Sequence, residues 1–345
     1  MEAPTARIAS SSIQLIHVQK MADDAKIIWI AWERHRRTME LCRFLGIPPM
    51  ALESSLPRLV RHVFNAVRTG RLIRRNRPKI LLVQNPSILL TLLSVFLRPI
   101  YGYKLVVDAH NAALVPETPL FKKAAFLLAF LQRRADLTIV TNEPLAKTVA
   151  NNGGRPFVLP DKIPTPNGKG KYSVKGRINI ACICTFKPDE PYRELFEAAK
   201  DFPEDVCFYV TGDFRRCPSG LVNAAPRNMI FTGFLGDPEY WTLLSSVDLV
   251  VDLTSRENCL VCGAYEAVAV KCPMVLSDTA ALRKYFSKGA IYTPNKAENI
   301  SEAIRKGIAM NGSLKQEVAS LNDELAAEYG ALADRLKDYI AANSL

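Results

Sequence analysis

Residues 252–278 read DLTSRENCLVCGAYEAVAVKCPMVLSD, and this segment passes from the end of a strand through a polar loop and a helix to a second strand. The first strand, Leu249–Leu253, is a continuous apolar run, which is typical of a strand buried on both faces of a parallel sheet. Small and apolar residues at helical spacing follow over Gly263–Val270, and Pro273 ends that helix before the strand Met274–Ser277. The segment therefore predicts a strand–helix–strand unit of an α/β protein.

Short apolar runs alternate with helical stretches along the rest of the chain, which indicates further parallel strands. A Pro/Gly-rich connection over residues 153–171 divides the alternation into two series, and 345 residues exceed the size at which one core usually keeps growing. We therefore expect two α/β domains, residues 1–165 and 172–325, followed by a charged helical tail, 326–345. The other predicted strands are Ile27–Ala31, Ile80–Val83, Leu105–Asp108, Leu137–Thr141, Ile178–Cys184, Val206–Val210 and Met229–Phe231.

The start of the helix after Leu253 has the features of an anion site. Backbone N–H groups around Leu260, Val261, Cys262 and Gly263 would point out of its first turn, where a helix favours negative charge. Glu266 follows, and a carboxylate near a strand end can accept two hydrogen bonds from a ribose diol. These residues predict a nucleotide-diphosphate site; alternatively, Glu266 only favours the helix dipole.

Three further motifs extend the pattern: the turn Thr211–Asp213 around Gly212, the passage NMIFTGFL at 228–235 with a later Tyr240, and PMVLSD at 273–278. Together with Glu266 they resemble family 4 of the retaining glycosyltransferases, which use nucleotide-diphosphate sugars. The resemblance implies a GT-B fold, in which two Rossmann-like doubly wound domains face each other across a cleft. It also implies that the tail crosses back to the first domain, that the first domain receives the acceptor and that the second binds the donor.

The sequence departs from the family pattern at two places. The family carries two glutamates separated by seven residues; counting back from Glu266, the first of them falls on Asn258 in this chain, with Glu257 one place earlier. An Asn amide can still hydrogen-bond a donor sugar, so both residues are candidates for the sugar contact. The family also places an Arg and a Lys on the pyrophosphate, where this chain has Thr185 and Glu190. Lys187 or Arg193, from the same loop and the helix after it, is the candidate replacement; either could instead be a solvated surface residue.

Polar residues also follow two predicted strands of the first domain. Arg34, His35, Arg36 and Arg37 come after the first strand and offer side-chain contacts to an anionic donor or acceptor, unless they form a plain solvated turn. His110 resembles the family's histidine, which lies near the transferred sugar, and is otherwise a structural residue. The later triplet 141–143 most simply caps a helix.

The net charge of +11 is unevenly distributed, because residues 1–160 hold 23 Lys/Arg against 10 Asp/Glu. Such a basic half is suited to an anionic membrane surface, an acidic substrate or nucleic acid, but no aromatic-basic RNA signature or zinc-finger spacing supports nucleic acid. The apolar stretches Ile88–Leu97 and Ala124–Leu131 are either core helices or membrane contacts. Met1–Lys26 lacks the pattern of a secretory signal. We therefore expect a cytoplasmic protein, with peripheral contact to the inner face of the membrane.

These observations predict a glycosyltransferase that moves a sugar from a nucleotide-diphosphate sugar to a glycan or lipid-linked acceptor with retention. No paired carboxylates stand at a strand end to hold Mg²⁺, and Cys259 and Cys262 lack a second metal-binding pair, so we expect no metal and no cofactor. Two alternatives remain open: a nucleotide-sugar epimerase of the same fold, and a binding protein that has lost catalysis.

Overall fold

The computed structural model describes residues 27–85, 87–114 and 125–343. Within it the chain forms two compact units of similar size, residues up to Asp161 together with those from Tyr329 onward, and Lys162–Glu328. Met1–Lys26, the subject of the secretory-signal expectation, and Ala124 lie outside the described residues. No helix in the described ranges is long and apolar enough to cross a membrane.

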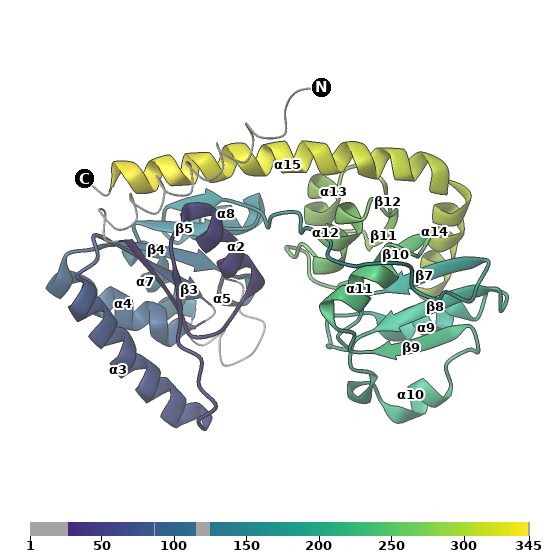
Figure 1. Ribbon diagram of the computed structural model, residues 1–345, viewed down its shortest axis with the longest axis horizontal. Helices are drawn as coiled ribbons and strands as arrows, with labels where there is room; N and C mark the ends of the chain where they lie inside the picture. The colour runs from purple at the N-terminus through teal and green to yellow at the C-terminus, as the bar shows by residue number, and fades with distance from the viewer. Residues whose placement is uncertain (1–26, 86, 115–124, 344–345) are drawn as a thin grey trace. The chain divides into compact units, whose positions relative to one another are not determined.

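The first unit, unit 1, is built on a six-stranded sheet in the order β2-β1-β3-β4-β5-β6 in which every neighbouring pair is parallel (Figure 1). Its strands are β1 (Ile27–Ala31), β2 (Pro49–Ala51), β3 (Ile80–Asn85), β4 (Lys104–Ala109), β5 (Leu137–Val140) and β6 (Pro156–Val158). Its helices are α2 (Arg36–Leu45), α3 (Arg58–Asn76), α4 (Ile88–Tyr101), α5 (Asn111–Leu114), α7 (Ala125–Arg134), α8 (Glu143–Asn151) and the end of α15 (Asn311–Ala342).

Helices cover both faces of this sheet. Leu41 of α2 and Ala333 and Leu336 of α15 share one core with Trp29 of β1. The other face packs against helices α4, α7 and α8, and α3 packs in turn on α4. Continuous apolar strands are therefore buried on both sides, as the sequence predicts.

The second unit, unit 2, has a six-stranded parallel sheet in the order β12-β11-β10-β7-β8-β9. Its strands are β7 (Ile178–Cys182), β8 (Val206–Thr211), β9 (Met229–Gly233), β10 (Leu249–Asp252), β11 (Met274–Ser277) and β12 (Ala290–Thr293). Its helices are α9 (Tyr192–Ala199), α10 (Ser219–Asn223), α11 (Asp237–Leu244), α12 (Cys262–Ala269), α13 (Ala280–Tyr285), α14 (Ala297–Ala309) and the first part of α15, besides a 3-10 turn, η1 (Phe214–Arg216). Two apolar clusters, one on each face of the sheet, form its core.

All nine strands expected from the sequence are confirmed, with ends that differ by at most two residues. The three strands that the sequence did not reveal, β2, β6 and β12, are edge strands of three or four residues. All three are short and largely half-buried, and two of them begin with a proline, Pro49 and Pro156, so their sequences lack the longer apolar run of a central strand. The expected helix cap is also confirmed, since Asn142 Oδ1 accepts the Leu145 N–H at 3.1 Å.

A buried ion-pair network fixes the carboxyl-end edge of the unit 1 sheet. Arg37 is 5% exposed, and its Nε donates to Asp108 Oδ1 at 2.9 Å while its two terminal nitrogens donate to Asp161 Oδ1 at 2.5 Å and the Leu159 carbonyl at 2.8 Å. Burial alone lowers the pKa of Arg37, but the charges of Asp108 and Asp161 outweigh burial and raise it. The expectation that Arg37 contacts an anionic ligand is therefore wrong, because its donors are used inside the unit.

Replacing Arg37 should destabilise the protein strongly. Arg37→Met leaves the carboxylate of Asp108, which is 1% exposed, without its cation, and breaking a buried pair costs about 3–5 kcal/mol. Urea unfolding followed by circular dichroism measures the loss. The neighbouring Arg36→Met is the matched control, since the Arg36–Glu40 pair is solvent-exposed and worth about 0.3–0.5 kcal/mol. Equal losses in the two variants would contradict the role given to Arg37.

Candidate nucleotide-sugar site

The predicted donor residues gather at one edge of the unit 2 sheet. Strands β10, β7 and β8 are parallel neighbours, so their carboxyl ends lie side by side. The segment after β10 carries seven candidates, the segment after β7 carries two, and one glycine follows β8. In that order they are Glu257, Asn258, Leu260, Val261, Cys262, Gly263, Glu266, Lys187, Arg193 and Gly212. The edge is where open α/β sheets bind ligands.

The start of α12 is fixed by a carboxylate from the preceding strand. Asp252 is buried at the end of β10, and its Oδ2 accepts the Gly263 N–H at 2.7 Å. A Cβ atom at position 263 would lie 2.5 Å from that same oxygen, so the close approach requires glycine. Asp252 thus caps a helix whose own N-cap residue, Val261, supplies no side-chain bond. One of the N–H groups expected to hold phosphate is therefore already used.

Glu266 lies on α12 about one turn after Gly263 and is half-buried. The hydroxyl of Tyr240, from α11, donates to Glu266 Oε2 at 2.5 Å. Burial, followed by the negative charge of Glu266, raises the pKa of Tyr240 well above its ordinary value, so this hydroxyl keeps its proton and stays a donor. Tyr240 orients the carboxylate that the sequence assigns to a ribose.

The loop after β7 closes on itself where the resembling family places two cations. Glu190 accepts hydrogen bonds from the backbone N–H groups of Thr185 and Phe186 at 2.7 and 2.8 Å and from the Thr185 hydroxyl. Phe186 adopts a left-handed conformation with φ of 58°, which this closure maintains. Thr185 and Glu190 therefore serve the loop and are not available as an anion clamp.

Two polar contacts tie this loop to the segment after β10. The Ser255 N–H donates to the Asp189 carbonyl at 2.7 Å, and Arg256 pairs with the Asp189 carboxylate at 3.0 Å. Asn295, after β12, also holds the segment after β10, because its amide donates to the Thr254 carbonyl at 2.9 Å. The two segments that carry the predicted donor contacts are thus held together as one surface.

A pocket of about 470 Å³ opens beside these ties. Arg193 is the one predicted donor residue among its described lining residues, which also include Tyr192, Ser255 and Asn295. Lys187 is exposed on the same loop, and neither Lys187 nor Arg193 forms an ion pair with a described residue. Both side chains are exposed, and their contact with a pyrophosphate stays a prediction.

Gly212 is required by the fold of the edge itself. It has φ of 89°, and a Cβ atom there would lie 2.0 Å from the Cys184 carbonyl oxygen. Glu257 is exposed and Asn258 half-buried in the β10–α12 segment, whereas Val261 is buried in the core and Leu260 packs against it. The side chains at 260 and 261 are apolar packing residues, so any ligand contact there is through the backbone.

Unit 1 brings two of its candidates together. The rings of His35, after β1, and His110, after β4, meet edge to face with centroids 4.3 Å apart. Burial lowers the pKa of His110 and keeps its ring neutral, while His110 Nε2 is buried with no described hydrogen-bond partner. Arg34 is exposed, and Arg36 is half exposed beside Glu40. A neutral imidazole with an unpaired nitrogen can exchange a hydrogen bond with a hydroxyl group.

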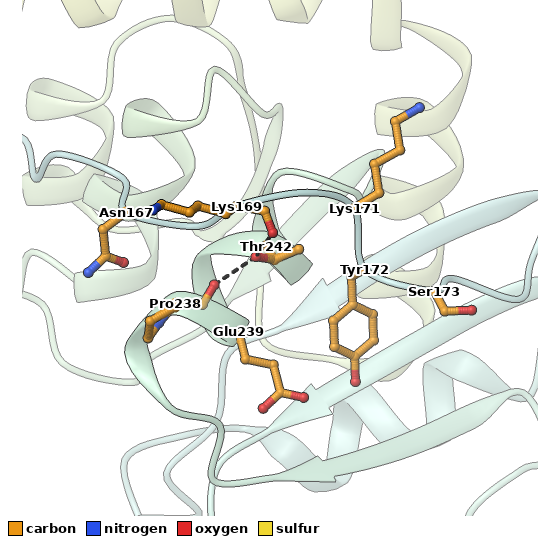
Figure 2. Close-up of a pocket in the computed structure, with 8 residues that line it drawn as sticks. All are labelled: Asn167, Lys169, Lys171, Tyr172, Ser173, Pro238, Glu239 and Thr242. Atoms are coloured by element: carbon orange, nitrogen blue, oxygen red, sulfur yellow. Dashed lines mark hydrogen bonds between the residues drawn. The ribbon is translucent and has the colours of Figure 1, made fainter.

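A larger pocket of about 540 Å³ lies elsewhere in unit 2, between the segment 167–173 and α11 (Figure 2). Its two lysines, Lys169 and Lys171, point in different directions, and Glu239 adds an opposing charge. None of the predicted site residues lines it in the described part of the chain. The described residues also contain no group of three or more His, Cys, Asp or Glu side chains placed to hold a metal ion.

Sequence reasoning assigned no role in the site to the polar residues that support this edge, namely Asp252, Tyr240, Ser277 and Asn295. Ser277 Oγ accepts the Thr254 N–H at 2.8 Å and donates to Asn295 at 2.7 Å, which fixes the first residue of the loop. The one available signal was Asp252, a carboxylate at the end of an otherwise apolar strand.

Solved structures with very different sequences share this architecture. The match to the Anabaena protein HepE, solved with UDP and glucose, covers 94% of this chain and 96% of HepE at 15% identity, with a TM-score of 0.67. The match to sucrose-phosphate synthase from Thermosynechococcus elongatus covers 85% of this chain and 82% of that protein at 14% identity, with a TM-score of 0.68. A glycosyltransferase from Rickettsia africae covers 94% of both chains at 13% identity, with a TM-score of 0.67.

A putative UDP-N-acetylglucosamine 2-epimerase from Listeria monocytogenes is also similar, with 90% and 94% coverage, 12% identity and a TM-score of 0.59. No family model matches the sequence, and no curated protein sequence matches it significantly. The chain has the GT-B fold, with two Rossmann-like units.

The charge state of Asp252 should make stability depend on pH. Burial, and then the charge of Glu266, raises the pKa of Asp252 well above its ordinary 3.8, although the Gly263 N–H opposes the shift. The folded protein therefore binds more protons than the unfolded chain, and the carboxyl group destabilises it progressively as pH rises from about 4 toward the raised pKa.

Asp252→Asn removes this titration and keeps an oxygen for the Gly263 N–H. Its melting temperature relative to the wild type should be higher at pH 8 than at pH 5, as measured by calorimetry. Asp323→Asn, on the exposed side of α15, controls for the loss of one carboxylate. A difference that is the same at both pH values, or larger at pH 5, would contradict the assignment.

Proposed function

We propose that this protein is a glycosyltransferase that takes a sugar from a nucleotide-diphosphate sugar. The observation that carries the proposal is the position of Glu266 on α12 behind the strand ends of a GT-B unit. Glycosyltransferases share the fold, and one similar protein, HepE, is solved with UDP and with UDP-glucose. Unit 2 would then bind the donor, and unit 1 would receive the acceptor.

The described residues supply a role for each part of the donor. Glu266, oriented by Tyr240, accepts hydrogen bonds from the ribose diol. The first-turn N–H groups of α12 other than that of Gly263 approach the pyrophosphate, and Lys187 and Arg193 offset its charge. Asn258 or Glu257 contacts the sugar. His110, which is neutral and whose Nε2 has no described hydrogen-bond partner, is the candidate in unit 1 for a hydrogen bond to a sugar hydroxyl.

Retention of anomeric configuration and membership of family 4 are part of the proposal and rest on the sequence resemblance. The proposed acceptor is a glycan or a lipid-linked precursor of a glycolipid or envelope polysaccharide, reached at the inner face of the membrane from the cytoplasm. Two observable outcomes distinguish this proposal from its alternatives. An epimerase, which one similar structure supports, converts the donor without acceptor, whereas a lapsed enzyme binds nucleotide without turnover.

Nucleotide binding should depend on Glu266. A thermal-shift screen against UDP, GDP, ADP and their sugars should give a rise in melting temperature with one base, because a ligand of the folded state stabilises it. Glu266→Ala should weaken the binding of that nucleotide about a hundredfold, since two hydrogen bonds to a charged group contribute about 3 kcal/mol.

Two variants control for indirect effects of Glu266→Ala. Tyr240→Phe removes the hydrogen bond between Tyr240 and Glu266 but keeps the Glu266 carboxylate, so this variant should retain most of the nucleotide binding. Glu298→Ala removes an exposed carboxylate from the first turn of α14 and should bind as the wild type does. If Glu266→Ala binds the nucleotide as tightly as Glu298→Ala does, the ribose is not at Glu266.

Turnover should not require a divalent cation. Leaving-group charge is offset in the proposal by Lys187, Arg193 and backbone donors, which are permanent parts of the site. Release of nucleoside diphosphate, assayed with excess EDTA and again with added Mg²⁺, should proceed at the same initial rate. Loss of activity on chelation that Mg²⁺ restores would assign the charge to a metal instead.

A further inference from the structure

Helix α3 of unit 1 has an inverted distribution of polar and apolar side chains. Its fully buried positions are Asn65, Thr69 and Ile73, one turn apart along a single face. Asn65 donates to the Leu52 carbonyl at 2.9 Å, and the Thr69 hydroxyl accepts from the Trp32 indole at 3.0 Å. Two of the three fully buried positions of the helix are thus polar, whereas Ile73 near its end joins the apolar core of the unit, against which Ala66 and Leu72 also pack.

The apolar side chains of α3 point outward. Leu59 is 81% exposed and Val63 is 67% exposed, and between them they define a stripe at the three- and four-residue spacing of one helix face. The other exposed members of the stripe are Val60, Phe64 and Val67. Apolar residues of this size on a soluble surface are usually scattered singly, so a contiguous stripe marks a surface that something else covers.

The second half of the same helix is basic. Arg68, Arg71, Arg74 and Arg75 lie there, followed directly by Arg77, and the helix contains no Asp or Glu. None of these arginines forms an ion pair with a residue that the structure describes. Arg68 lies over the ring of Phe64 at 5.4 Å, which places a guanidinium next to the apolar stripe.

The neighbouring helices also carry exposed apolar side chains. Helix α3 packs on α4, and α4 packs on α7, on the same side of the sheet (Figure 1). Phe96 and Ile100 of α4 and Phe126 of α7 are 62%, 71% and 79% exposed. The expectation from the sequence that Ile88–Leu97 is either buried or surface-docking has a mixed outcome: Leu90 and Val95 are buried, while Phe96 points outward.

We propose that the outer side of α3, defined by the apolar stripe 59–67 and the arginines 68–77, binds the surface of an anionic lipid bilayer. An amphipathic helix that lies in the interface buries apolar side chains at the headgroup boundary and pairs basic ones with anionic lipids. Both groups are present here on one helix, and its arginines form no ion pair with a described residue. The inference extends the proposed function only by giving the protein access to a lipid-linked acceptor.

Charge complementarity favours a bilayer over other occupants. Nucleic acid would use the arginines but would leave Leu59, Val60 and Val63 in water, because a phosphate backbone offers them no apolar surface. A second copy of this chain would bring an equally basic helix, whose charges would repel at a two-fold contact. An anionic bilayer accommodates the apolar and the basic half together.

The test is flotation of the full-length protein with vesicles of phosphatidylcholine alone or with 30% phosphatidylglycerol, at low and high salt. We expect binding to the anionic vesicles that falls as salt rises. The combined change Arg71→Gln, Arg74→Gln and Arg75→Gln should weaken binding about a hundredfold, at about fivefold for each basic residue. The combined change Leu59→Gln, Val63→Gln and Val67→Gln should weaken it at every salt concentration.

Matched controls use exposed residues of unit 2. Lys169→Gln with Lys171→Gln and Arg227→Gln removes the same number of charges, and Phe234→Gln removes an 88% exposed aromatic ring. Both controls should float as the wild type does, and all variants should keep the wild-type melting temperature because the changed side chains are exposed.

Equal flotation with neutral vesicles, no loss in the α3 variants, or a salt-sensitive shift of the protein on DNA or RNA in place of flotation would overturn the proposal. A wild-type dimer that the α3 variants dissociate, seen by sedimentation, would assign the surface to a second copy and overturn it too. Nucleotide-induced thermal shifts report the proposed function separately, since none of the α3 changes touches unit 2.

Discussion

The contact between the Asp252 carboxylate and the Gly263 N–H determines the geometry of the donor edge. It joins the last residue of β10 to the first turn of α12 at 2.7 Å and admits no side chain at position 263. Because the helix begins at that contact, Glu266 is held about one turn away, within reach of the Tyr240 hydroxyl. A strand end, a helix start and an oriented carboxylate thus follow from one buried hydrogen bond.

The same contact affects the charge balance that an anionic donor meets. Burial raises the pKa of Asp252, and the charges of Glu266 and Glu190 add to the shift. A shift toward the neutral form of Asp252 reduces the repulsion of a nearby pyrophosphate. Glu190 is itself bound to backbone N–H groups of its own loop. Asp252 and Glu190 are therefore hydrogen-bonded to backbone N–H groups of their own unit, while Lys187 and Arg193 are exposed to solvent.

The physical reasons for success and failure of sequence reasoning are visible in particular elements. Strands such as Leu249–Asp252 were predictable because burial on both faces forces a continuous apolar run. The edge strand Pro49–Ala51 is half-buried, has only three residues and begins with a proline, so its sequence is too short to indicate a strand. Arg37 was misassigned because an arginine in a basic run is normally solvated, and the partners that bury it lie 71 and 124 residues away. The roles of Lys187, Arg193 and Glu266 toward a ligand remain predictions.

The sharing of helix α15 between the units has a consequence for biosynthesis. Tyr329, Ala333, Leu336 and Ile340 complete the core that covers Trp29, although the residues of unit 2 separate them from β1 along the chain. Translation delivers the first six strands long before the helix that covers one of their faces. Unit 1 therefore leaves the ribosome with this apolar sheet surface covered only in part, by α2, until unit 2 has been made, which is the interval in which chaperones bind nascent chains. An N-terminal fragment ending near Asp161 would keep that exposed surface permanently and should aggregate.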